Sequence, residues 1–389
     1  MKVADLQAYL LSSPLPEPLA VQTAGGEIRW RKKDCLLVRI QTDQGQTGFA
    51  AGPASANLAQ LINRNLKPAV VNLDPTKLDS LRKKVFQRRP QFPGLSQAFG
   101  LVEVALLDLR GKIEGRSLSE LLGGQVRKQI PLIASAGLYL SPEQCAEEAA
   151  AIAADGFSSY KFRAGLGPAV DAQTVHAVRR ALPPACRMIV DARCWWQMGT
   201  TYRSRRLLDW TAEIADCHPL WLAEAFPLES GLAERIGNCK SIVFASGELE
   251  SSAADLRAHA ERASFEVAQL NVTLLGGLQV CRELLRWFSE AGKRCILTGG
   301  ATPLEVLTLA HLASCASLDV CLGVDWPCHS TQRRPGMFPF PLGDELLKQP
   351  PMRDNGSVIL TNAPGVGGEV NEGVIQRYPW KSDPGRGRQ

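Results

Sequence analysis

The stretch SSYKFRAGLGPAVDAQTVHAVRRAL, residues 158–182, joins a short apolar run to an amphipathic segment. Residues 158–163 have the length and composition of a strand, and apolar residues recur every three or four positions over residues 171–182. A loop containing glycine and proline separates the two parts. Such a strand–loop–helix unit is typical of a parallel sheet covered by helices.

The same unit recurs along the chain from about residue 130. The candidate strands are residues 130–135, 158–163, 188–191, 220–224, 242–246, 266–271, 295–298 and 318–322. The expected helices are residues 142–154, 171–182, 205–215, 231–237, 253–263, 278–291 and 304–315. Eight strands at a step of roughly 25 residues predict a parallel (β/α) barrel of the TIM type. A doubly wound sheet is the alternative, but no G-x-G-x-x-G turn follows the first strand.

The segment before the barrel has a different pattern. A hairpin with Asp43 and Gly45 at its turn is expected near residues 35–50, followed by helical stretches. We therefore expect an α/β protein with three parts. Residues 1–128 form an α+β capping domain, residues 129–335 form the barrel, and residues 336–389 return to the capping domain.

Composition restricts the possible partners. Hydrophobic residues make up 45% of the chain, charged residues make up 21%, and the net charge is +5, which is the balance of a soluble globular protein. The basic residues are dispersed, so we expect no nucleic-acid partner. No window approaches the roughly 18 apolar residues of a membrane helix, so we expect no membrane partner. Eleven cysteines without a C-x-x-C pair favour free thiols and a cytoplasmic location.

Carboxylates stand at the ends of three successive candidate strands. In a barrel of this type the functional groups project from the C-terminal ends of the strands. Asp191, Glu224 and Glu248 occupy such ends, and Mg²⁺ prefers oxygen ligands of this kind. The pattern predicts a magnesium site made by these three residues. The alternative is that the acids only cap the helices that follow.

Two cationic residues end the second candidate strand. Lys161 and Arg163 are two positions apart, so their side chains face the same side of the sheet. A fixed cation beside a lysine lowers the pKa of that lysine, which would let Lys161 act as a base near neutral pH. The alternative is an ordinary salt-bridged pair.

The order of these residues resembles that of the enolase superfamily, in its mandelate racemase and muconate lactonizing branch. The resemblance covers nearly the whole chain. The segments that carry it are residues 106–127, 156–165, 272–278 and 364–369. Several such matches in the right order are specific for fold and ancestry.

The resemblance implies a chemistry. Members of that family remove the proton next to a carboxylate while Mg²⁺ holds the enediolate that forms. For this chain the resemblance implies a lyase or isomerase that dehydrates or epimerises a hydroxy or sugar acid. It also implies that Lys161 is the base, that Arg163 is its partner, and that the protein forms a homo-oligomer. The alternative is a diverged member that binds an anionic ligand without the usual acid/base pair.

Several positions depart from the family pattern. Arg193 stands where the family usually has asparagine, and a cation there would oppose a metal. Ala223 occupies the usual ligand position, so Glu224 can replace it only if the strand end is bulged. Asn271 stands where the family has an aspartate or a lysine, and Thr298 or Gly299 stands where the family has a histidine. The usual second base is therefore missing.

Other features of the mouth lead to further expectations. Thr302 and Glu305 have the spacing of a capping box, and the amides of that helix start could hold an anion. Asp325 and His329 are an alternative acid–base pair. Specificity would depend on residues 12–26 and 52–56 of the capping domain, and the loop of residues 194–203 is expected to close over the mouth.

Overall fold

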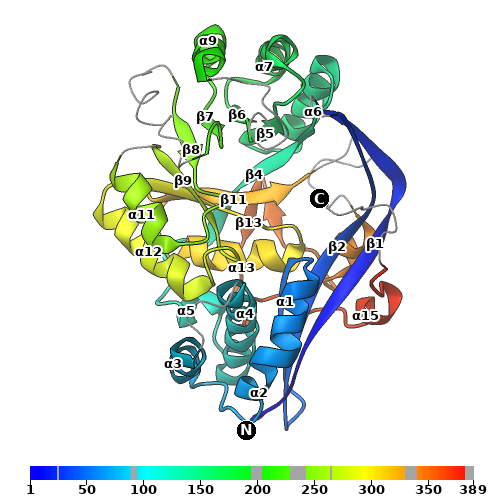
Figure 1. The fold of residues 1–389 in the computed structure, drawn as a ribbon, viewed down its shortest axis with the longest axis vertical. Coiled ribbons are helices and arrows are strands. Elements are labelled where there is room, and N and C mark those ends of the chain that lie inside the picture. Colours follow the sequence, from blue (N-terminus) through cyan, green and yellow to red (C-terminus); the bar gives the residue numbers. More distant parts are fainter. Residues whose placement is uncertain are drawn as a thin grey trace.

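A closed parallel barrel forms the centre of the molecule (Figure 1). The computed structural model describes residues 1–23, 26–88, 94–193, 204–227, 242–262, 265–328 and 340–381. The barrel strands are β4 (Gln129–Leu138), β5 (Ser159–Arg163), β6 (Arg187–Asp191), β7 (Trp221–Ala223), β8 (Phe244–Ser246), β9 (Val267–Asn271), β10 (Arg294–Thr298) and β11 (Cys321–Pro327). Strand β11 pairs with β4 and closes the ring. The predicted (β/α) barrel is confirmed.

Helices connect the strands on the outside of the ring. They are α6 (Pro142–Ala154), α7 (Pro168–Ala181), α9 (Ser204–Ile214) with the 3-10 turn η2 (Ala215–Cys217), α11 (Ala253–Glu261), α12 (Leu278–Glu290) and α13 (Pro303–Ser314). Each begins and ends within three residues of its predicted bounds. The helix expected at residues 231–237 lies outside the described residues.

Strand alternation decides which side chains enter the barrel. A cluster of apolar side chains fills the interior and includes Ile133, Ile189, Trp221, Ala223, Ala245, Val267 and Ile296. On β5, Tyr160 and Phe162 stack on each other at 5.7 Å and belong to the outer core under the helices. Lys161 and Arg163 alternate with these two residues and therefore face the interior, on one side of the sheet as predicted.

The eighth strand begins later than expected. The predicted strand ends at residue 322, whereas β11 starts at Cys321 and continues through Asp325. Its pairing with β10 slips by one residue around Gly323, where a Cβ atom would lie 2.6 Å from the carbonyl oxygen of Pro131. The slip is a bulge, which reverses the alternation of the residues beyond it. As a result, Leu322 packs against the interior cluster and Asp325 also faces inward.

The capping domain combines a three-stranded antiparallel sheet with helices. Its strands are β1 (Val3–Thr23), β2 (Gly26–Thr42) and β3 (Thr47–Pro53), and its helices are α1 (Ala56–Gln60), the π-helix η1 (Leu61–Leu66), α2 (Lys67–Val70), α3 (Leu78–Arg88), α4 (Leu95–Glu114) and α5 (Leu118–Leu121). The long β1–β2 ribbon runs along one side of the molecule (Figure 1). Trp30 on this ribbon packs against Leu138 and Tyr139 at the end of β4, and so does Leu166, which follows β5. The ribbon therefore covers one side of the barrel mouth.

Helix α4 holds the capping domain close to the barrel. A Cβ atom on Gly100 would lie 2.8 Å from the backbone nitrogen of Gly277, so the two backbones meet without a side chain between them. The buried Glu103 carboxylate accepts a hydrogen bond from the backbone N–H of Gln279 at 3.1 Å. These contacts seat the capping domain against the loop that precedes α12.

The C-terminal segment divides between the two units. It contains α14 (Pro341–Glu345), β12 (Arg353–Asp354), β13 (Ser357–Ile359) and α15 (Val374–Arg377). Strand β13 pairs with β4 and so extends the barrel sheet. Val366 and Tyr378 contact the capping domain, through hydrogen bonds with Asp108 and Ser12. Across the ranges described above, no helix has the length and apolarity needed to cross a membrane.

Candidate active site

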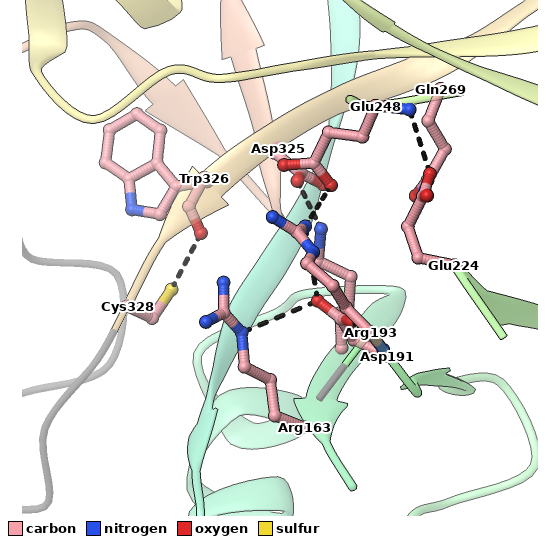
Figure 2. Close-up of polar contacts among 10 residues, drawn as sticks. Arg163, Asp191, Arg193, Glu224, Glu248, Gln269, Asp325, Trp326 and Cys328 are labelled. Carbon is pink, nitrogen blue, oxygen red and sulfur yellow. Dashed lines mark hydrogen bonds and ion pairs between the residues drawn. The ribbon is translucent and has the colours of Figure 1, made fainter. Parts of the chain in front are cut away.

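A cluster of charged side chains lies at the C-terminal ends of the barrel strands (Figure 2). It consists of Lys161 and Arg163 from β5, Asp191 and Arg193 at and beyond the end of β6, Glu248 after β8, and Asp325 on β11. Three cations and three carboxylates thus meet where the fold class places functional groups. Arg163 is the most exposed member, with 28% of its side chain accessible.

Lys161 forms a buried ion pair with Asp325. The lysine side chain is 4% exposed, and its Nζ contacts Asp325 Oδ2 directly. The other oxygen, Asp325 Oδ1, is buried and has no hydrogen-bond partner within the described residues. It is therefore available to a ligand or a water molecule.

The pKa of Lys161 differs in direction from the sequence-based expectation. Burial acts to lower the pKa of Lys161, but the carboxylates of Asp325, Glu248 and Asp191 outweigh it, so the pKa lies above its usual value. The direction is opposite to the lowered pKa expected beside a bound cation, and the role of Lys161 as a base stays a prediction. Burial raises the pKa of Asp325, although the ammonium of Lys161 opposes that shift.

Arg163 faces the mouth beside Asp191. Its Nε lies 3.5 Å from Asp191 Oδ2. Its two terminal nitrogens make no hydrogen bond or ion pair with the described residues. A guanidinium with both terminal nitrogens available can bind a carboxylate through two parallel hydrogen bonds.

Arg193 lies between two of the predicted metal ligands. Its Nη2 is 2.5 Å from Glu248 Oε2 and 3.7 Å from Asp191 Oδ2. Its backbone N–H also donates to Asp191 Oδ1 at 3.0 Å. Burial acts to raise the pKa of Asp191, but Arg193, Arg163 and Lys161 outweigh it and lower that pKa. Asp191 is therefore an ionised carboxylate surrounded by fixed cations.

Glu224 reaches the barrel interior by a break in the strand. Ala223 faces the interior, so the residue after it would ordinarily face outward. Glu224 instead has a left-handed backbone, with φ of +50°, which turns its side chain inward. Its Oε1 accepts hydrogen bonds from Gln269 Nε2 at 2.7 Å and from the backbone N–H of Glu248 at 2.8 Å. Burial, together with the Glu248 carboxylate, raises the pKa of Glu224 to about 7.

The three acids predicted to hold Mg²⁺ do not fit a metal ion as they are arranged. Two of them, Asp191 and Glu248, share a guanidinium, and the third is bonded to an amide side chain. Within the described ranges, no three His, Cys, Asp or Glu side chains form a group suited to a metal. The magnesium site stays a prediction.

Three neighbouring strands present buried polar atoms to the same interior. Gln269 Oε1 on β9, Thr298 Oγ1 on β10 and Asp325 Oδ1 on β11 lack hydrogen-bond partners in the described part of the chain. Asn271, at the end of β9, accepts a hydrogen bond from the backbone N–H of Leu274 at 3.2 Å and so stabilises a turn. The role of Gln269 as partner of Glu224 was missed in the sequence. Its inward position, two residues after Val267, was the available signal.

The start of α13 has the predicted cap. Thr302 Oγ1 accepts a hydrogen bond from the backbone N–H of Glu305 and donates to Glu305 Oε2 at 2.8 Å. Glu305 Oε2 also accepts from the backbone N–H of Ala301, so this amide is not available to an anion. A cavity of about 20 Å³, lined in part by Glu305, Thr298 and Val104, separates the cap from the capping domain. Its size suits one water molecule.

Two of the expected site features belong to loops outside the described part of the chain. His329, the suggested partner of Asp325, and residues 194–203, the suggested mouth loop, lie outside the described residues. Ser12, in the first of the suggested specificity segments, donates a hydrogen bond to Asp34 at 2.6 Å within the β1–β2 ribbon.

Comparison with known proteins establishes the family to which this chain belongs. Residues 144–374 match the family described as enolase C-terminal domain-like. Residues 10–123 match the N-terminal domain of the mandelate racemase and muconate lactonizing enzymes. The chain therefore belongs to the mandelate racemase and muconate lactonizing group of the enolase superfamily. Members of this superfamily generally use Mg²⁺.

Individual relatives are distant but cover the chain. D-galactarolactone cycloisomerase of Agrobacterium fabrum is 23% identical over 97% of this chain and 99% of its own length. L-Ala-D/L-Glu epimerase of Clostridium acetobutylicum is 24% identical over 94% and 98%. The crystal structure of 3,6-anhydro-D-galactonate cycloisomerase from Zobellia galactanivorans has a TM-score of 0.83 at 20% identity, covering 98% of this chain and 100% of that one. Cycloisomerases, epimerases and dehydratases are thus among the relatives of this protein.

Proposed function

We propose that this protein is a lyase or isomerase that removes the proton next to the carboxylate of a small hydroxy acid, such as a sugar acid. The observation that carries the proposal is the buried pair of Lys161 and Asp325 beside the guanidinium of Arg163 at the barrel mouth. Relatives that are cycloisomerases, epimerases and dehydratases support the same reaction class.

Substrate binding follows from Arg163. Its side chain is the most exposed of the charged cluster, and its terminal nitrogens point away from Asp191 (Figure 2). A substrate carboxylate would bind these nitrogens through two charge-assisted hydrogen bonds. The α-carbon of such a substrate would then lie toward the Lys161–Asp325 pair.

Charge stabilisation is the second requirement of the reaction. Removal of an α-proton places a further negative charge on the carboxylate, and this charge must be held by fixed positive groups in a site with little water. Arg163, Arg193 and Lys161 supply three cations around Asp191. They are already oriented by ion pairs, so they need not reorganise when the charge develops.

The proton would move through the ion pair and not through the lysine alone. Asp325 Oδ1 has no described partner and would accept the proton from the α-carbon. The Lys161 ammonium would donate a proton to a β-hydroxyl, which leaves as water when the carbon–oxygen bond breaks. Asp325 would then return its proton to Lys161 through their direct contact. Both groups act from one side of the substrate, which favours syn elimination.

The test is solvent exchange. The parent protein is incubated in D₂O with a panel of aldonic, aldaric and other 2-hydroxy acids, and deuterium at the α-carbon and dehydrated products are followed by NMR. We expect exchange or product with at least one acid, and loss of both in Lys161→Met and Asp325→Asn. Lys348→Met, which removes an exposed lysine paired with Glu369 in the C-terminal segment, is the matched control and keeps the activity. Exchange that survives in both site variants would refute the assignment.

A second candidate function is binding of an anionic ligand without turnover. It is favoured by Asn271, which stabilises a turn, and by Thr298, which cannot transfer a proton as a histidine does. Calorimetric titration with the same acids separates the two candidates. Binding that is lost in Arg163→Gln, with neither exchange nor product in the parent, would support the second function and exclude the first.

A further inference from the structure

The position of the Arg193 guanidinium has a consequence for metal binding. Its Nη2 lies 2.5 Å from Glu248 Oε2 and 3.7 Å from Asp191 Oδ2. These carboxylates come from different strand ends, and the Arg193 guanidinium forms an ion pair with each of them (Figure 2). The Arg193 side chain is only 15% exposed, so it is held inside the site.

A divalent ion would need the same space. Mg²⁺ binds oxygen ligands at about 2.1 Å and demands a nearly octahedral shell. An ion placed between Asp191 and Glu248 at such distances would coincide with the guanidinium. A neighbouring guanidinium would also repel the ion at short range. Ion and guanidinium therefore exclude each other.

The remaining acid is also occupied by the protein itself. Glu224 Oε1 accepts two hydrogen bonds, from Gln269 Nε2 and from the backbone N–H of Glu248. Ala223, on the inward position of the same strand end, has no oxygen on its side chain to offer. Each of the three carboxylates predicted to bind the metal is thus paired with a donor group of the protein itself.

We infer that Arg193 is a tethered cation that replaces the divalent ion at this position. It neutralises Asp191 and Glu248 and keeps positive charge at the barrel mouth without any metal. The protein in its natural form therefore does not bind Mg²⁺ or Mn²⁺ at this site. This inference depends only on the contacts of Arg193, and it holds whether the protein catalyses the proposed reaction or only binds an anion.

Metal binding by the protein alone tests the inference. Mn²⁺ is titrated into the parent, Arg193→Ala and Arg193→Lys, and free Mn²⁺ is measured by electron paramagnetic resonance. We expect no saturable binding by the parent or by Arg193→Lys. In Arg193→Ala the freed carboxylates should bind Mn²⁺ with a dissociation constant at least about tenfold below any value found for the parent. Arg294→Ala, which removes an exposed arginine at the far end of β10, is the matched control and should behave as the parent.

Thermal unfolding gives a second readout that needs no activity. Arg193→Ala in EDTA leaves Asp191 and Glu248 without their cation, so its midpoint should fall and should recover on addition of Mn²⁺ or methylguanidinium. Arg193→Gln, which is closer in size, is used in the same way if the alanine variant does not fold. Saturable binding of Mn²⁺ by the parent, or no gain of binding in either neutral variant, would overturn the inference.

Discussion

The buried carboxyl of Glu305 leads to a quantitative prediction about stability and pH. Glu305 is 5% exposed and lies at the start of α13, against the capping domain. We consider Glu305→Gln, which removes the titrating group and keeps one oxygen to accept the hydrogen bonds from Thr302 Oγ1 and the Ala301 N–H. The variant therefore changes charge at nearly constant shape.

The magnitude follows from the pKa. Burial raises the pKa of Glu305 from 4.5 to about 7, because the ionised form loses hydration that its hydrogen bonds only partly replace. The folded pKa lies above the unfolded one, so the unfolded chain binds fewer protons in this window and stability falls as pH rises through it. Each pKa unit is worth about 1.4 kcal/mol, so the full penalty of ionised Glu305 is about 3 kcal/mol above pH 7.

The assay compares the free energies of unfolding of the parent and the variant in urea. Near pH 5 the penalty is about 1 kcal/mol or less, and near pH 8 it is about 3 kcal/mol. Glu305→Gln should therefore gain about 2 to 3 kcal/mol relative to the parent between these two conditions. The control is Glu283→Gln, which removes an exposed glutamate from α12. If the difference between parent and Glu305→Gln does not change with pH, Glu305 is not the buried, uncompensated acid that the structure shows.

Three further perturbations have expected outcomes. Lys161→Met should lower the free energy of unfolding in urea by about 3 to 5 kcal/mol, because Asp325 would be left buried and unpaired. The double variant Lys161→Met, Asp325→Leu should recover most of that stability, and equal losses in the single and double variants would contradict this explanation. Alanine favours a helix, but Gly100→Ala should destabilise the protein by about 1 to 3 kcal/mol because its Cβ would meet the backbone of Gly277. A rise in the melting temperature of this variant would count against the close approach of the two backbones. Burial lowers the pKa of His311 to about 4, below the ordinary 6.5, so the stability of the parent should fall by about 3 kcal/mol as the pH falls through that window. Thermal unfolding of His311→Gln should show a smaller loss of stability, and identical pH profiles of the parent and the variant would contradict the prediction.

Much of the fold was predictable from short-range patterns. Strand and helix periods, which depend on residues within a few positions of each other, led to all eight barrel strands and to six of the connecting helices within the described ranges. The same alternation placed Lys161 and Arg163 on one side of the sheet. The capping motif at Thr302 is equally local, since its partners are three residues apart.

The chemistry of the site could not be read in the same way. Glu224 reaches Gln269 only because one residue adopts a left-handed backbone, and Asp325 reaches Lys161 only because a bulge reverses the alternation of β11. Neither event changes the composition or the period of its strand enough to be recognised. Sequence comparison identified Arg193 as a departure from the family pattern, but not as the group that connects Asp191 with Glu248.

Local periodicity and the family resemblance were enough to predict the barrel, the capping domain and the strand ends on which charged residues stand. Which of these charges meet became known only from the three-dimensional packing. Lys161 and Asp325 are 164 positions apart, and Arg193 and Glu248 are 55 positions apart. Pairing over such separations depends on strand register, bulges and single backbone angles, and these are set by the packing of the whole barrel.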